Sequence, residues 1–212
     1  MCSESRGWRA VDLGRVGLVV LAAGRSERMG APKALVSIAG RPLLEHLLQG
    51  PVIRRLVDVV VVLGHHSEAV EPVVRRLGFR WVLDPLPDRG RTGSVQRGLA
   101  AFGAKVTGVF IQPVDCPLVR EETYLALAGK LHGADVAVPA LGQRRGHPPL
   151  VAARMFPTIL AAPADKPLRE LLGAPGVRRR IVPVEDPGVL VNVDRPEDLL
   201  ELEELYRRAH RS

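Results

Sequence analysis

The sequence predicts a three-layer α/β sandwich built on a mostly parallel sheet, and three observations indicate it. Short runs rich in valine and leucine lack the alternation of half-buried strands, which is typical of parallel strands covered on both faces. Helical segments separate these runs in strand–helix–strand order. Most of the polar residues suited to chemistry directly follow the runs, at the sheet edge where ligands bind in such folds.

The elements follow in chain order from the first apolar run. Residues 16–23, interrupted only by Gly17, indicate a buried strand, and the polar residues 24–30 indicate a loop after it. Pro42 suits the first turn of a helix, and the last helix is amphipathic. We predict further strands at 57–63, 79–83, 106–112, 135–139, 150–152 and 180–184, a loop at 141–149, and helices at 42–48, 67–77, 94–102, 121–131, 153–160, 166–172 and 195–208.

Length and composition favour one globular domain. The chain has 212 residues, of which 46% are hydrophobic and 25% charged, enough to bury one substantial core. We expect a flexible N-terminal segment at 1–14 and a single domain at 15–212. Two cysteines are too few for a disulfide framework or a structural zinc site. With a polar N-terminus and no long apolar run, the expected location is cytoplasmic, without a membrane partner.

The net charge of +7 indicates an anionic partner. Arginines are spread along the chain, and the longest basic run, residues 178–180, lacks the interleaved aromatic residues that stack nucleic-acid bases. We therefore expect a small phosphorylated ligand and no nucleic acid.

The loop after the first strand has the composition of a phosphate-binding loop. Residues 21–33 read LAAGRSERMGAPK, and small residues let backbone N–H groups approach phosphate oxygens. It is not a Walker A loop, because five residues separate its glycines and the lysine follows three positions later. Arg25, Arg28 and Lys33 suit the β- and γ-phosphates and a departing pyrophosphate. The alternative is a glycine-rich connection with solvated cations.

Asp115 stands at the end of an apolar strand-like run, in the segment 109–117, which reads VFIQPVDCP. A carboxylate there would stand at the carboxyl edge of the sheet, and Mg²⁺ prefers such hard oxygen ligands together with phosphate oxygens. The alternative is that Asp115 caps the next turn or helix.

These segments together resemble the MobA-like nucleotidyltransferases, most closely the molybdenum cofactor cytidylyltransferases. The resemblance also rests on GRPLL at 40–44, VVLGH at 61–65, GS at 93–94, DCP at 115–117, GHP at 146–148 and the segment 192–199. It implies a nucleotide-diphospho-sugar transferase type of fold at 15–212. It further implies transfer of CMP from CTP to a phosphorylated acceptor, the molybdopterin cofactor, with release of pyrophosphate.

The resemblance assigns roles to individual residues. It makes Arg25, Lys33 and Asp115 catalytic, and it places Mg²⁺ on Asp115 and Asn192, with Asp194 as a further ligand or a neighbour of one. Cys116 departs mildly from the family, and helix capping is the alternative for Asp194. The implied nucleotide-binding residues are Leu21, Ala22, Ala23, Gly24, Arg25, Lys33, Thr92, Gly93 and Ser94, and the implied acceptor-binding residues are Arg145, Gly146, His147 and Pro148.

Several alternatives stay open. Ser94 would also suit the N-cap of a helix. The residues LAAGR at 21–25 favour CTP, since guanylyl-transferring relatives read LAGGR there, but a guanylyltransferase for molybdenum cofactor or a cytidylyltransferase for a sugar or alcohol phosphate has the same loop. A non-catalytic accessory protein for molybdoenzyme maturation is the alternative of another class. We expect a monomer or homodimer, with a molybdoenzyme or its chaperone as a possible partner, and no role for His65 and His66 in a surface loop.

Overall fold

The computed structural model describes residues 12–103 and 106–210. Most of the N-terminal segment predicted at 1–14, including Cys2, lies outside the described residues; of the part described, Leu13 is buried in the core. Within the described residues, no helix combines the length and the apolar composition that crossing a membrane requires.

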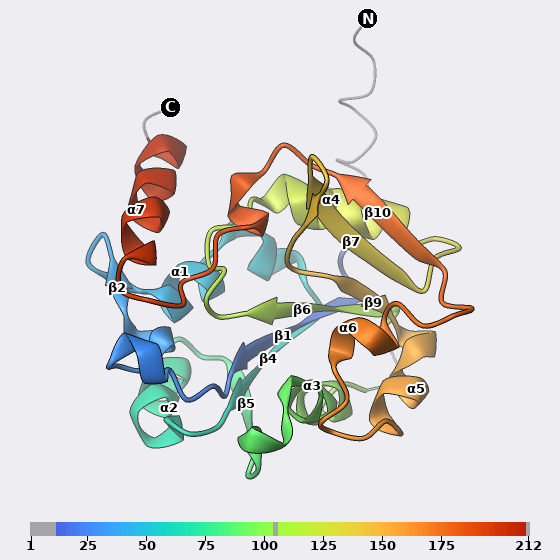
Figure 1. The fold of residues 1–212 in the computed structure, drawn as a ribbon, viewed down its shortest axis with the longest axis horizontal. Coiled ribbons are helices and arrows are strands. Elements are labelled where there is room, and N and C mark those ends of the chain that lie inside the picture. Colours follow the sequence, from blue (N-terminus) through green and yellow to red (C-terminus); the bar gives the residue numbers. More distant parts are fainter. Residues whose placement is uncertain (1–11, 104–105, 211–212) are drawn as a thin grey trace, which may run out of the picture.

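The centre of the molecule is an eight-stranded sheet (Figure 1). Its main path runs β10-β7-β9-β6-β1-β4-β5, and β8 pairs with β7. Only β8 and β9 run antiparallel to their neighbours, so the predicted mostly parallel sheet is confirmed. The strands are β1 (Val16–Ala22), β4 (Asp58–Leu63), β5 (Arg80–Leu83), β6 (Gly108–Pro113), β7 (Val136–Leu141), β8 (Arg144–Arg145), β9 (Leu150–Ala152) and β10 (Arg179–Pro183).

Helices cover both faces of this sheet and complete the predicted three layers. Helices α1 (Leu43–Leu48), α2 (Ser67–Arg76) and α4 (Glu121–Lys130) bury leucine and valine side chains against one face. Helices α3 (Arg91–Ala100), α5 (Phe156–Leu160) and α6 (Leu168–Leu171) lie on the other face. The strands are therefore buried on both sides, which explains their continuous apolar runs.

A small satellite core holds the C-terminal helix against the N-terminal half. The hairpin of β2 (Ser37–Ile38) and β3 (Arg41–Pro42) leads into α1, and α7 (Asp198–Ala209) lies beside it in Figure 1. Ile38, Val193 and Leu202 are fully or almost fully buried between them. This packing brings the segment before α7 next to the loop after β1.

Some predicted boundaries were wrong. Helix α3 begins at Arg91 rather than at residue 94, because Gly90 takes a φ of 120° that turns the chain into the helix earlier. Helix α7 begins at Asp198 rather than at residue 195. The predicted loop 141–149 contains β8, because Gly142, at a φ of 58°, folds the chain back onto β7. The predicted helices near 153–160 and 166–172 are shorter, and a 3₁₀ turn, Ala153–Met155, precedes α5.

Candidate active site

A cavity of about 390 Å³ opens at the carboxyl ends of β1, β4 and β6. Its position agrees with the rule that ligands of open α/β sheets bind beyond the carboxyl ends of the strands. The glycine loop lines this cavity, and so do two acids from other segments, Asp115 after β6 and Asp194 before α7. The charged and histidine side chains along it are Arg25, Glu27, Arg28, Lys33, His65, His66, Asp88, Arg91, Asp115 and Asp194.

Local backbone geometry aims Lys33 into this cavity. Ser26 adopts a left-handed conformation with a φ of 55°, which starts a 3₁₀ turn at Glu27–Met29. The Ser26 hydroxyl oxygen then accepts a hydrogen bond from the Lys33 backbone N–H at 3.0 Å. This bond closes the loop on itself and turns the lysine back toward the sheet.

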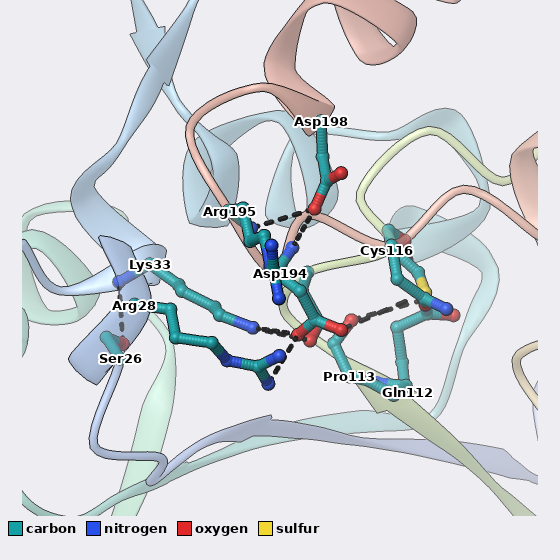
Figure 2. Close-up of polar contacts among 11 residues, drawn as sticks. Ser26, Arg28, Lys33, Gln112, Pro113, Cys116, Asp194, Arg195 and Asp198 are labelled. Carbon is teal, nitrogen blue, oxygen red and sulfur yellow. Dashed lines mark hydrogen bonds and ion pairs between the residues drawn. The ribbon is translucent and has the colours of Figure 1, made fainter.

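Lys33 joins two carboxylates that are distant in sequence. Its Nζ lies 3.3 Å from Asp115 Oδ2 and 2.5 Å from Asp194 Oδ1. The side chains of Lys33 and Asp115 are only 17% and 15% exposed, so water screens this pair weakly. The hydrogen bond from Lys33 is the main reason that the pKa of Asp194 is lowered. Figure 2 shows Lys33 and Arg28 both directed at Asp194.

Buried hydrogen bonds fix the turn that carries Asp115. Gln112 is fully buried at the end of β6, donates to the Cys116 carbonyl at 2.7 Å and accepts from the Tyr124 hydroxyl at 2.9 Å. The Asp115 carbonyl accepts from the backbone N–H of Val193 at 3.0 Å. The turn after β6 and the segment before α7 are thereby held together.

Asn192 contacts Cys116, the residue after Asp115, although Asn192 is not among the residues that line the cavity. The buried Cys116 thiol donates to Asn192 Oδ1, and its sulfur lies 3.9 Å from Asp115 Oδ1. Burial raises the pKa of this thiol well above its usual value, so it stays protonated. Among the described residues, no group of three or more histidine, cysteine, aspartate and glutamate side chains is arranged to hold a metal ion by itself.

These donors fit a divalent cation of the Mg²⁺ type. The ammonium group of Lys33 between Asp115 and Asp194 already marks the place as one that favours positive charge. Two carboxylates and the amide oxygen of Asn192 are hard ligands, and Mg²⁺ takes few protein ligands besides substrate phosphates. The residues present therefore fit the metal.

The capping alternative for Asp194 is wrong. Asp198 accepts from the backbone N–H groups of Asp194 and Arg195 at 2.7 and 2.8 Å, at the start of α7. The Asp194 carboxylate instead contacts Lys33 and, at 3.9 Å, Arg28. Its charge is available to the cavity.

Asp88 forms an ion pair with Arg25 of the glycine loop. The guanidinium of Arg25 donates to both carboxylate oxygens of Asp88, at 2.6 and 2.5 Å, and His65 Nε2 lies 2.8 Å from the same group. The Arg25 hydrogen bond lowers the pKa of Asp88 to about 2. His66 contacts the Arg25 carbonyl at 2.7 Å. His65 and His66, for which no role was predicted, therefore line the cavity.

The segment 92–94 anchors the start of α3. Thr92 is buried and donates its hydroxyl to the Lys166 carbonyl at 2.6 Å, and the Gly93 N–H donates to Ala164. Ser94 donates to Asp84 Oδ2 at 2.6 Å. Ser94 lies inside the helix, so the N-cap alternative is wrong; of the three, only Ser94 lines the cavity.

A second cavity of about 400 Å³ adjoins the first. Its lining is largely apolar, with Ile111, Val138 and Leu172 among the contributors, and it shares Leu21, Arg91 and Pro113 with the first cavity. The remaining charged or polar side chains around it are Arg145, His147, Arg169 and Arg179.

The loop 145–148 forms part of the wall of this second cavity. A Cβ on Gly146 would lie 2.2 Å from the Val189 carbonyl oxygen, so only glycine allows this approach. Nδ1 of His147 is buried without a hydrogen-bond partner among the described residues. Burial also lowers the pKa of His147, which keeps its ring neutral. Arg145, Gly146 and His147 line the cavity, whereas Pro148 does not.

Comparison with known proteins decides the family. The model of the MobA-like NTP transferase domain matches residues 18–180. The chain belongs to this family. The resemblance predicted from the glycine loop and its partner motifs is thereby confirmed.

Solved structures share the fold of this MobA-like chain. A homologue of Mycobacterium tuberculosis rv0371c from Mycobacterium sp. strain JC1 is 27% identical, with a TM-score of 0.80 over 92% of this chain and 98% of that one. Rv0371c from M. tuberculosis, in complex with manganese, is 24% identical, with a TM-score of 0.75 over 90% and 98%. Molybdopterin-guanine dinucleotide biosynthesis protein A from Archaeoglobus fulgidus is 21% identical, with a TM-score of 0.69 over 91% and 99%.

Curated relatives match a part of this MobA-like chain. The bifunctional protein GlmU of Novosphingobium aromaticivorans is 37% identical over 120 residues, which are 56% of this chain and 26% of that protein. The chain thus spans about a quarter of the length of the curated relatives it matches.

Within this family fold, sequence reasoning gave no individual role to Asp88, Arg91 or His65. Asp88 precedes α3, Arg91 is the first residue of α3, and His65 follows β4. The signal that was available was position: each follows a strand whose carboxyl end meets the same sheet edge.

Proposed function

We propose that this MobA-like protein transfers CMP from CTP to a phosphorylated acceptor, the molybdopterin cofactor, and releases pyrophosphate. The observation that supports it most is the convergence of Lys33, Asp115 and Asp194 in a cavity next to a second, apolar cavity with arginines around it. The first cavity suits the nucleotide, and the second suits an acceptor with an apolar body and an anionic group.

The proposed reaction needs no nucleophilic side chain. An oxygen of the acceptor phosphate attacks the α-phosphorus, the bond from the α-phosphorus to the bridging oxygen breaks, and pyrophosphate leaves with that oxygen. Arg25 and Lys33 neutralise the charge on the leaving pyrophosphate. Asp115 and Asn192, with Asp194 beside them, would hold Mg²⁺, which withdraws charge from the phosphate oxygens.

The choice of CTP rests on the residues at the carboxyl end of β1. Leu21 and Ala22 of β1 and Ala23 after it line the first cavity together with Ser94, and the two small alanine side chains leave the backbone available to the base. Thr92 and Gly93 support this wall through their contacts with the segment 164–166. Guanylyl transfer to the same cofactor, or cytidylyl transfer to a sugar or alcohol phosphate, is the alternative.

The choice of a cyclic, anionic acceptor rests on the second cavity. Apolar walls suit a flat ring system, and Arg145 suits a phosphate group. Nδ1 of His147, buried and without a partner among the described residues, is a further polar atom in the loop that lines this cavity. Gly146 and Pro148 set the path of the loop that presents both side chains.

The direct test is pyrophosphate release from CTP, GTP, UTP and ATP, each with Mg²⁺, with and without molybdopterin cofactor. We expect release that depends on the cofactor and is fastest with CTP. Release from GTP alone would favour the guanylyltransferase alternative. Nucleotide binding without release, whichever phosphorylated acceptor is supplied, would favour an accessory protein for molybdoenzyme maturation. Size-exclusion chromatography of the same samples distinguishes a monomer from a homodimer.

Removing Asp88 should strengthen nucleotide binding. In Asp88→Asn, the bidentate ion pair that now occupies Arg25 is lost and only the exposed contact with Glu27 at 3.2 Å remains, so the guanidinium is more available to the triphosphate. Because exposed ion pairs contribute only about 0.2–1 kcal/mol, we expect the Kd of CTP from calorimetry to fall about two- to fivefold. Asp165→Asn, an exposed acid outside the cavity, is the control and should leave the Kd unchanged. Weaker binding in Asp88→Asn would contradict the role given to Arg25.

A further inference from the structure

Among the residues that the structure describes, Arg91 is the one charged residue that lines both cavities. The other two shared residues, Leu21 and Pro113, carry no charge. In the reaction proposed above, the atoms that must meet come from the two sides of this boundary: the α-phosphate from the nucleotide and a phosphate oxygen from the acceptor. A cation at the boundary is therefore placed differently from cations that face one cavity only.

Arg91 also differs from the other cations of the nucleotide cavity in its partners. Lys33 is paired with Asp115 and Asp194, Arg25 with Asp88, and Arg28 with Asp194. Across residues 12–103 and 106–210, by contrast, the Arg91 side chain has no hydrogen bond or ion pair. Its donors are thus available to a ligand without the loss of an existing contact.

The cavity walls place Arg91 beside functional groups of both cavities. Asp115 and Asp194 line the first cavity together with Arg91, and His147 lines the second cavity together with Arg91. The charge of Arg91 also adds to the lowering of the pKa of His147, for which burial is the main cause. A single guanidinium therefore stands where the cavity of the proposed metal ligands meets the cavity of the acceptor loop.

The backbone under Arg91 is fixed from both sides. Gly90, which precedes it, takes a φ of 120°, and a Cβ there would lie 3.0 Å from the Ala164 carbonyl oxygen. Thr92, which follows it, donates its hydroxyl to Lys166, and the Gly93 N–H donates to Ala164. The first turn of α3 is thus held against the segment 164–166, and only the side chain of Arg91 remains to adjust to substrates.

We propose that Arg91 is a catalytic residue that bridges the α-phosphate of the nucleotide and the attacking phosphate of the acceptor. Guanidinium presents several N–H donors in one plane and can bind two phosphate groups at once, which an ammonium group does less well. Arg91 brings the two anions together and stabilises the charge that develops as the new oxygen–phosphorus bond forms and pyrophosphate departs. It gives up no proton in this step.

The inference rests on the proposed function, and turnover is its first test. We expect Arg91→Gln to lower kcat for pyrophosphate release from CTP and molybdopterin cofactor about 100-fold, while the Kd of CTP alone changes much less. Arg91→Lys should recover only part of the loss. Arg97→Gln, six residues further along α3 and outside both cavities, is the matched control. Unchanged kcat in Arg91→Gln, or a loss in kcat/KM that equals the loss in CTP affinity, would overturn the assignment.

A binding experiment tests the bridge without turnover. CMP is titrated calorimetrically in Mg²⁺, with and without inorganic phosphate as the probe for the acceptor's phosphate. We expect phosphate to strengthen CMP binding several-fold in the wild type and in Arg97→Gln but not in Arg91→Gln, since a shared cation couples the two sites. Equal coupling in all three proteins would overturn the role of Arg91.

The two experiments separate failure of this inference from failure of the proposed function. A wild type that binds neither CTP nor CMP would contradict both. Coupled binding in the wild type without turnover would contradict the acceptor but support Arg91. Turnover that is intact in Arg91→Gln would contradict Arg91 alone.

Discussion

Asp115→Asn should reduce pyrophosphate release from CTP by about 1,000-fold or more while the protein stays folded. Of the two acids that contact Lys33, Asp115 has the less exposed side chain, at 15%. The proposed reaction uses this carboxylate to hold the metal. A metal that stabilises charge in the transition state contributes several kcal/mol, and about 1.4 kcal/mol corresponds to a tenfold change in rate. The measurement is kcat at saturating CTP over a range of Mg²⁺ concentrations.

The control for Asp115→Asn is Glu201→Gln, which removes an exposed acid from α7 that lines neither cavity. It should keep full activity. Circular dichroism and thermal melting check that the Asn variant keeps its fold, since Gln112 and Val193 still hold the turn through backbone groups of residues 115 and 116. Activity within tenfold of the wild type in a folded Asp115→Asn would contradict the role of this acid in metal binding.

Lys33→Met should reduce turnover by about 100- to 1,000-fold through a different route. The variant keeps the metal ligands but loses the cation that faces the leaving pyrophosphate. Because Lys33 no longer competes for Asp115 and Asp194, we expect Mg²⁺ or Mn²⁺ to bind at least as tightly as in the wild type. Metal binding from calorimetry, measured beside kcat, therefore separates Lys33→Met from Asp115→Asn.

The same variant should change the dependence of stability on pH. The folded pKa of Asp194 is lowered from 3.8, mainly by the Lys33 hydrogen bond, so its contribution to stability is present above pH 3.8 and is lost as pH falls through the folded pKa. Lys33→Met should lack this contribution, so that its Tm falls less steeply than the wild-type Tm below pH 4. Lys130→Met, at the exposed end of α4, is the control. Equal slopes in all three proteins would show that the Asp194 pair does not contribute to folding.

Much of the fold could be predicted because local runs of apolar residues mark the strands. The run at β1 is apolar throughout, the run at β6 is apolar except for the buried Gln112, and strand–helix alternation then leaves few arrangements. Two of the boundaries that were wrong lie where a glycine with a positive φ redirects the chain, at Gly90 and Gly142. A local pattern shows that such a glycine is present but not which way it turns the backbone.

The candidate site was predictable where its residues end a strand or carry a motif, as Lys33 and Asp115 do. Arg25 was predicted as a cation for the phosphates, and only the structure shows that it is paired with Asp88, 63 residues away. Ser94 suited a helix cap by sequence but bonds Asp84 inside a helix. Such partners depend on the path of each loop over the sheet edge.

The sequence by itself thus determined the layers of the fold, the phosphate-type loop after the first strand, and the presence of an acid at the end of β6. Only the tertiary structure decided that Lys33 meets both Asp115 and Asp194, and that Arg91 stands where two cavities join. The physical reason is the sequence separation over which each kind of interaction acts. Hydrophobic periodicity and turn propensity act over a few neighbouring residues, whereas these contacts connect segments up to 161 residues apart and follow from sheet order and core packing.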